Sequence, residues 1–201
     1  MIVYSETKKI FVLDALSNNI SPKVERLYLK ETGYKPNKSE VLAWEGSMQY
    51  MKNILEDQDI PDDVGIAIEY KIPQTSKRID FIITGKDEDS KSAILVELKQ
   101  WSDGISATNK DAVLNAAFYG REVSHPSYQA WSYASLLEDY NQAVQEKKIN
   151  LKPCAYLHNY PTDSGVINDP EYSEWTQKAP AFLREDFYKL RDFIKKYIKY
   201  G

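Results

Sequence analysis

Residues 77–101 read KRIDFIITGKDEDSKSAILVELKQW, and this stretch decides the fold. Residues 78–84 and 93–99 within it are rich in Ile, Val and Phe, and the segment between them is polar and begins with glycine. This pattern predicts two β-strands joined as a hairpin. Three ionisable residues interrupt the two apolar runs: Asp80, Glu97 and Lys99. Because burying an unpaired carboxylate is costly, we expect these side chains to have a partner or a cation.

Side-chain alternation along the strands indicates what these residues could do together. Glu97 and Lys99 share one face of their strand with Leu95. If Asp80 opens onto the same face, two carboxylates and an ammonium converge, and oxygen ligands of this kind suit Mg²⁺ or Mn²⁺. The lysine could polarise a phosphate or orient a water molecule. The alternative is a cross-strand salt bridge between Asp80 and Lys99, with Glu97 at a solvated strand end.

Length and composition favour one folded domain over residues 1–201. The chain ends with a predicted helix followed by Gly201, which suits the end of a domain cut from a longer protein. The net charge of −4 argues against a domain that holds nucleic acid by bulk electrostatics, although an enzyme can still touch nucleic acid locally. The single cysteine, Cys154, cannot form an internal disulfide, and no apolar run is long enough to span a membrane. We therefore expect a cytoplasmic protein that does not associate with a membrane.

The chain before the hairpin is expected to be mostly helical. Residues 1–36 form a predicted helical extension, with helices at 7–16 and 22–31, and the core begins at residue 37. A stronger helix is predicted over 39–56, with Ser39 as its N-cap. A strand over 64–72 follows, so three antiparallel strands are expected in a row.

Three glutamates before the hairpin are candidates to complete a metal site. Glu40 lies at the edge of the apolar stripe of the 39–56 helix and is the better candidate, whereas Glu45 lies further towards solvent. The alternative for Glu40 is that it only stabilises the helix N-terminus through the dipole. Glu69 could reach the site, but we expect it to be an exposed carboxylate on its strand.

The segment after the hairpin, residues 102–124, is polar, without clear periodicity, and is predicted to be a loop. Trp101 and Arg121 could stack on or pair with nucleic acid. Lys110 could do the same, but we expect it to be an ordinary surface residue. His125 is expected to be structural, like the only other histidine, His158.

The last third of the chain begins with a strong predicted helix over 126–147. Five residues are expected to form its buried stripe: Ala130, Tyr133, Leu137, Tyr140 and Val144. Gln129 is a stacked neighbour of Tyr133 on that face. A fourth strand at 151–158 is expected beside the third through a crossover. Three further segments complete the chain: a loop at 159–180, an edge strand at 181–183 and a closing helix at 185–200.

This order of elements and motifs resembles the PD-(D/E)XK nuclease superfamily. Ile79-Asp80 stands where the family has Pro-Asp, and Glu97-Leu98-Lys99 matches its third-strand motif. Residues 129–133, Gln-Ala-Trp-Ser-Tyr, match the Gln-x-x-x-Tyr motif of the RecB-like branch. The resemblance implies an α/β fold, with a restriction-endonuclease-like mixed central β-sheet flanked by helices. The upstream histidine common in RecB-like enzymes is absent, and Glu40 would substitute for it.

The amino-acid sequence of residues 61–85, 96–101 and 125–139 also resembles an N-terminal domain of bacterial and phage proteins. In those proteins it precedes a P-loop, helicase-like ATPase domain. The ATPase domain is therefore an expected partner of this chain.

The resemblance implies a metal-dependent nuclease acting on nucleic acid, in particular DNA. Asp80 and Glu97 would hold Mg²⁺ or Mn²⁺, with the backbone carbonyl of Leu98 helping and Glu40 contributing directly or through water. Lys99 would position the attacking water or stabilise the transition-state oxyanion. Gln129 and Tyr133 would orient the strand or Lys99. The alternative function is a catalytically silent domain on the same fold that binds nucleic acid or docks a partner.

Overall fold

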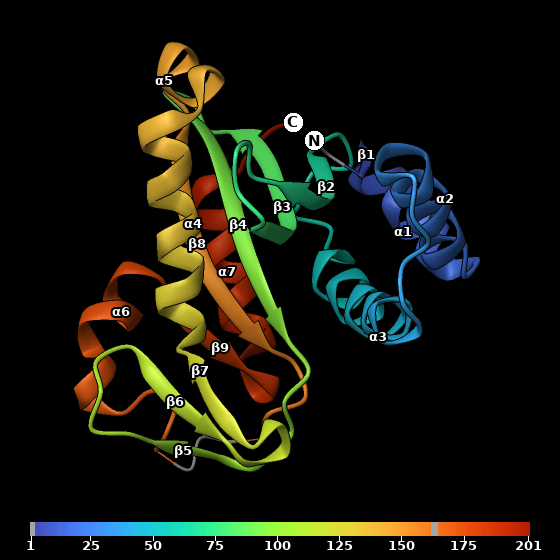
Figure 1. The fold of residues 1–201 in the computed structure, drawn as a ribbon. Helices are drawn as coiled ribbons and strands as arrows, with labels where there is room; N and C mark the ends of the chain where they lie inside the picture. The colour runs from blue at the N-terminus through green and yellow to red at the C-terminus, as the bar shows by residue number, and fades with distance from the viewer. Residues whose placement is uncertain (1–2, 162–164) are drawn as a thin grey trace.

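The computed structural model describes residues 3–161 and 165–201. Ile2 of the N-terminal extension and residues 162–164 of the predicted 159–180 loop lie outside this part of the chain. A mixed central sheet dominates the fold, with its strands in the order β1-β2-β3-β4-β8-β9 (Figure 1). The strands are β1 (Tyr4–Thr7), β2 (Gly65–Lys71), β3 (Arg78–Lys86), β4 (Lys91–Lys99), β8 (Asn150–Leu157) and β9 (Ala181–Leu183).

The first four strands in this order are antiparallel, and β8 and β9 continue the sheet in parallel. The predicted hairpin is confirmed as β3 and β4, which pair from Phe81 opposite Val96 to Lys86 opposite Lys91. The predicted crossover is also confirmed, because β8 lies beside β4. The α/β class with a mixed central β-sheet flanked by helices is therefore confirmed.

Helices cover both faces of this sheet, as Figure 1 shows. The core on one face joins apolar side chains of the sheet to four helices: α1 (Lys8–Leu16), α2 (Ile20–Thr32), α3 (Lys38–Leu55) and α7 (Phe187–Tyr197). Residues of the predicted N-terminal extension thus share this core. On the opposite face, α4 (Pro126–Tyr140) packs Tyr133 and Leu137 against Ile82 and Leu95. Within the described ranges, no helix is long and apolar enough to cross a membrane.

The start of α3 differs from the prediction. The N-cap is Asn37 rather than Ser39, because the Asn37 side chain accepts a hydrogen bond from the Glu40 backbone N–H at 2.9 Å. Glu40 in turn accepts from the Asn37 backbone N–H at 3.1 Å, which completes a capping box. Glu40 therefore stabilises the N-terminus of α3, as the alternative to a role at a metal site expected.

The prediction of a loop at 102–124 is wrong, because this segment forms a small antiparallel sheet. It contains β5 (Ile105–Ala107), β6 (Val113–Ala116), the 3₁₀ turn η1 (Ala117–Tyr119) and β7 (Arg121–Ser124). Each strand has only three or four residues, too few to show a period in the sequence. The sheet is held by Ile105, Leu114 and Ala116, which are buried in a third core with Leu157.

Two further predictions need correction. The helix predicted over 126–147 is divided at Asn141, which has extended backbone angles and caps α5 (Gln142–Lys147) with its side chain. Tyr140 therefore leaves the buried stripe and is 81% exposed. The predicted 159–180 loop contains η2 (Pro170–Tyr172) and α6 (Ser173–Lys178), whose Trp175 is buried.

His125 is confirmed as a structural residue, since it caps α4 from a fully buried position. Its Nδ1 accepts from the Ser127 backbone N–H at 3.1 Å, which leaves Nε2 to donate to the Ile167 carbonyl at 2.9 Å. Burial lowers the pKa of this histidine, against the opposing effect of the Ile167 carbonyl. Protonating Nδ1 would also break the cap, so the folded state requires a neutral ring.

We therefore expect acid to destabilise the fold through His125. Because the folded-state pKa lies below the unfolded value of about 6.5, the unfolded chain binds the proton more tightly. This contribution is fully present above about pH 6.5 and falls by at most about 1.4 kcal/mol per pH unit below it. Urea unfolding at pH 7 and pH 5 should show a shallower loss for His125→Asn, whose amide can still cap the helix. Equal losses in both proteins would contradict this prediction.

Candidate active site

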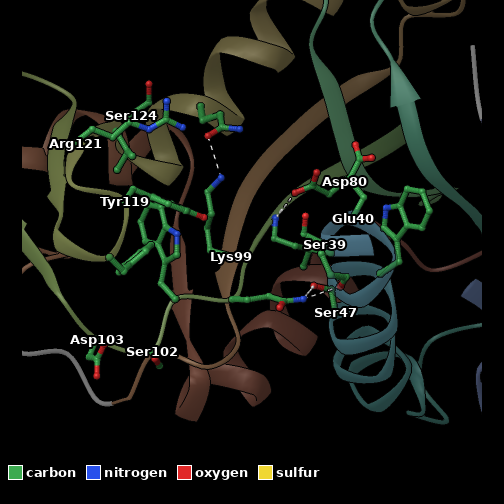
Figure 2. Close-up of a pocket in the computed structure, with 18 of the residues that line it drawn as sticks. Ser39, Glu40, Ser47, Asp80, Lys99, Ser102, Asp103, Tyr119, Arg121 and Ser124 are labelled. Carbon is green, nitrogen blue, oxygen red and sulfur yellow. Dashed lines mark hydrogen bonds between the residues drawn. The ribbon is translucent and has the colours of Figure 1, made fainter. Parts of the chain in front are cut away.

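A pocket of about 880 Å³ lies between the first turns of α3 and the small sheet. Asp80 and Lys99 lie in the middle of it, with Glu40 on the α3 side and Tyr119 and Arg121 on the opposite side (Figure 2). Most of the predicted site residues line this pocket: Glu40, Asp80, Leu98, Lys99, Trp101, Arg121 and Gln129. Glu97 and Tyr133 do not line it; both are buried behind Gln129 and Lys99.

Asp80 links the two central strands at the point where their backbone pairing stops. The last paired residues on this side are Phe81 and Val96, and beyond them Asp80 Oδ2 accepts a hydrogen bond from the Leu98 backbone N–H at 2.8 Å (Figure 2). Asp80 is half-buried, and this burial raises its pKa against the opposing effects of Lys99, the Leu98 N–H and Arg78. The side chain is thus fixed at the pocket while its charge is poorly compensated.

A short hydrogen-bonded network connects β4 to α4. Lys99 Nζ lies 2.6 Å from Glu97 Oε1 and donates to Gln129 Oε1 at 3.1 Å. Gln129 Nε2 donates to the same Glu97 oxygen at 2.6 Å and lies 2.9 Å from Tyr133 Oη. The structural alternative from the sequence is wrong in both parts, because Lys99 pairs with Glu97 rather than Asp80, and Glu97 is only 3% exposed.

The electrostatics of this network leave negative charge uncompensated. Burial raises the pKa of Glu97 to about 8, and the nearby charge of Asp80 adds to the effect, although Lys99 opposes it. Burial alone would lower the pKa of Lys99, but Glu97 and Asp80 raise it overall. The ammonium is therefore held in its charged form beside two carboxylates that burial disfavours as anions.

The oxygen atoms present are of the type that a hard divalent cation binds. Glu97 Oε2 is buried without a hydrogen-bond partner, which is unusual for a carboxylate oxygen. Asp80 and Leu98, which both line the pocket, add further oxygens. Among residues 3–161 and 165–201, however, no group of three or more His, Cys, Asp or Glu is placed to hold a metal. A cation here would take two carboxylates at most and complete its shell with water or substrate, as Mg²⁺ commonly does.

The other candidate glutamates are engaged elsewhere or exposed. Glu40 Oε1 accepts from Arg78 Nη2 at 2.8 Å, and its Oε2 belongs to the capping box. Both oxygens of Glu40 are therefore occupied, and a direct role at a cation would require it to leave these partners. Glu45 is exposed, as predicted.

Glu69 was predicted to be exposed, and this is wrong, because it is only 7% exposed at the pocket. Its φ of 57° turns the side chain towards α3, where Oε1 accepts from Trp44 Nε1 at 2.8 Å. Oε2 lies 3.0 Å from Arg78 Nη1. Burial raises the pKa of Glu69 to about 7, with Asp80 adding to the rise and Arg78 opposing it.

The sequence held a signal for Glu69 that strand alternation missed. In the antiparallel register of β2 and β3, Ile68 pairs with Phe81 and Tyr70 pairs with Ile79. Glu69 therefore lies across from Asp80, between these two pairs. Register counting on the predicted strands would have placed it at the site, whereas its unusual backbone angle could not be foreseen.

The predicted nucleic-acid contacts differ in exposure. Trp101 is 7% exposed and packs in the third core, with its ring centroid 5.5 Å from Lys99 Nζ. Arg121 is exposed at the pocket, and Lys110 pairs with Glu122 at 2.7 Å on the surface, as expected for a surface residue. Two exposed aromatic residues that the sequence reading did not single out, Phe118 and Tyr119, also line the pocket.

Comparisons with known proteins do not assign a family to this chain. No family model matches it, and searches of curated proteins and of solved structures found no match. The resemblance in the motifs therefore stays a prediction.

Proposed function

We propose that the chain is a metal-dependent nuclease that hydrolyses phosphodiester bonds of nucleic acid, in particular DNA. The observation that carries the proposal is the buried, unpartnered Oε2 of Glu97, beside Asp80 on the neighbouring strand and Lys99 on its own. Carboxylate oxygens left without a partner in this way fit Mg²⁺ or Mn²⁺. Asp80 and Glu97 would hold the ion, with the Leu98 carbonyl as a further ligand and Glu40 acting through water.

When bound, the ion supplies an activated water and neutralises charge on the phosphate. The protein residues contribute position and charge. Lys99 remains an ammonium because Glu97 and Asp80 raise its pKa, and it points into the pocket where a phosphate oxygen or a water could accept from it (Figure 2). Gln129 holds Lys99 at 3.1 Å, and Tyr133 holds Gln129 at 2.9 Å, so both act as positioning residues.

The charge of the pocket also supports a bound cation. Five acidic residues line it: Glu40, Glu69, Asp80, Asp103 and Glu122. Only Lys99 and Arg121 are basic among the lining residues. Arg78 pairs with Glu40 and Glu69, and Lys110 pairs with Glu122, but Asp80 and Asp103 would still repel a phosphodiester unless a divalent cation compensated them.

A second candidate function is a catalytically silent domain that binds nucleic acid or docks a partner, for which the P-loop ATPase domain is the proposed partner. The observation in its favour is that Lys99 and Gln129 already satisfy Glu97 Oε1 and separate Glu97 from the pocket. Against it, a scaffold has no need to keep Glu97 Oε2 buried without a partner, because such a group destabilises the fold.

The test is a cleavage assay with supercoiled plasmid, linear duplex, single-stranded DNA and RNA, each with Mg²⁺, Mn²⁺ or EDTA. We expect cleavage of at least one substrate with either ion and none with EDTA. Cleavage that persists in EDTA would contradict a metal-dependent mechanism. No cleavage of any substrate, together with no saturable Mn²⁺ binding by calorimetry, would favour the silent domain.

A further inference from the structure

A row of aromatic side chains leads from Lys99 to the edge of the pocket. Lys99 Nζ lies 5.5 Å from the ring centroid of Trp101, and the ring of Trp101 lies 6.1 Å from that of Phe118. The rings of Phe118 and Tyr119 are 4.5 Å apart, and the guanidinium of Arg121 lies over Tyr119 at 5.7 Å. All five residues line the same pocket, and Figure 2 labels Lys99, Tyr119 and Arg121 among them.

The outer part of this row is exposed. Phe118 is 48% exposed and Tyr119 is 55% exposed, whereas Trp101 beneath them is buried. The two exposed rings belong to η1, a 3₁₀ turn between β6 and β7, and this turn contributes no buried residue to a core. The fold therefore gains little from these two aromatic side chains, which present their rings to whatever enters the pocket.

The charge of the protein restricts which nucleic acid such a surface could hold. With a net charge of −4 and a mostly acidic pocket, the chain cannot rely on many phosphate contacts, which are the main source of affinity for duplex DNA. Stacking on aromatic rings and on an arginine plane needs no such contacts, and only unpaired bases offer their faces for it. Bases within a duplex are already stacked on one another.

We propose that Phe118, Tyr119 and Arg121 form a stacking platform for unpaired nucleobases, so that the substrate enters the pocket as a single strand or a frayed end. This inference rests on the proposed nuclease function, because it places the stacked bases next to Lys99. The platform binds the bases, and the Asp80, Glu97 and Lys99 cluster receives the phosphodiester that joins them.

The experiment measures fluorescence anisotropy of a labelled 20-nucleotide oligo(dT), the matching oligo(U) and a 20-base-pair duplex, with Ca²⁺ in place of Mg²⁺ or Mn²⁺ to compensate the carboxylates of the pocket. Gel electrophoresis verifies that the strands stay uncut. The full chain is compared with Phe118→Ala and Tyr119→Ala, and with Tyr119→Phe, which keeps the ring. Tyr140→Ala is the matched control, because Tyr140 is also exposed, at 81%, but lies at the far end of α4. Thermal unfolding of each variant shows whether it remains folded.

We expect the single strands to bind more tightly than the duplex. Each alanine variant should weaken single-strand binding about 5- to 100-fold, whereas Tyr119→Phe and Tyr140→Ala should bind like the wild type. The oligo(dT) and oligo(U) arms show which sugar the platform accepts. Equal affinity for duplex and single strand, unchanged binding by both alanine variants, or no binding of any strand would overturn the inference.

The two proposals fail in different ways. If stacking is found but no substrate is cleaved with Mg²⁺ or Mn²⁺, the platform stands and the nuclease does not. If single strands are cleaved by Phe118→Ala and Tyr119→Ala at the wild-type rate and subsaturating substrate, the nuclease stands and the platform does not.

Discussion

Replacing Lys99 by alanine is expected to lower the rate of metal-dependent cleavage at least about 100-fold, as the loss of one group that stabilises transition-state charge typically does. The ammonium is the only lysine charge among the residues that line the pocket, and the hydrogen bond to Gln129 fixes its direction. Arg121 lies on the small sheet, at the side of the pocket opposite α3, and cannot replace the Lys99 ammonium (Figure 2). Single-turnover cleavage of the preferred substrate measures the effect.

The fold should survive this change, because Glu97 can lose its charge when the lysine is absent. Its pKa is already raised to about 8, and the loss of Lys99 removes an effect that lowers it, so the carboxyl takes up a proton at neutral pH. Lys99→Met keeps the apolar stem and provides a second variant if the alanine protein unfolds. Lys52→Ala is the matched control, since Lys52 also pairs with a glutamate, Glu56, at 2.7 Å and does not line the pocket. Full activity of Lys99→Ala or Lys99→Met would contradict the assigned role.

The contacts around Lys99 also show which features of the site could be predicted from the sequence alone. Side-chain alternation placed Glu97 and Lys99 on one face of β4, and their atoms meet at 2.6 Å. The helical spacing of Gln129 and Tyr133 predicted neighbours, and they are hydrogen-bonded at 2.9 Å. These predictions succeeded because each depends on the regular geometry of one element.

The parts that the sequence did not predict depend on irregular geometry or on tertiary packing. Glu69 reaches the site through a positive φ, a conformation that residues other than glycine seldom adopt. The small sheet that carries Phe118 and Tyr119 consists of strands too short for a periodic signal. Lys99 bonds to Glu97, whereas Asp80 bonds to the Leu98 N–H, and no spacing rule reveals this division of partners.

Asp80→Asn is expected to weaken Mn²⁺ binding at least about 100-fold, since even residues outside the first coordination shell commonly cost 10- to 100-fold when removed. The substitution is chosen because an asparagine carbonyl can still accept the hydrogen bond from the Leu98 N–H that Asp80 Oδ2 accepts at 2.8 Å. The link between β3 and β4 is then kept while the negative charge is lost. Isothermal titration calorimetry with Mn²⁺ at pH 8 measures the change.

Asp80→Asn should not lower the stability of the fold, although it weakens Mn²⁺ binding. This combination distinguishes a metal ligand from a carboxylate that supports the fold. Burial raises the pKa of Asp80, which means that its charged form is less favourable in the folded chain than in the unfolded chain. This cost is absent at low pH, where the carboxyl is protonated, and appears as the pH rises above the unfolded value of about 3.9. At pH 8 the neutral Asp80→Asn protein should therefore unfold in urea at the same or a higher midpoint than the wild type.

Asp103→Asn is the control for charge alone, because Asp103 lines the same pocket but is exposed on the loop that follows Trp101. It should bind Mn²⁺ like the wild type. A fall in affinity confined to Asp80→Asn, without a loss of stability, means that this carboxylate is maintained at an energetic cost for the cation. Loss of stability in Asp80→Asn with unchanged Mn²⁺ binding would instead make Asp80 part of the scaffold. In that case the charge of the carboxylate would stabilise the fold and would not bind the cation.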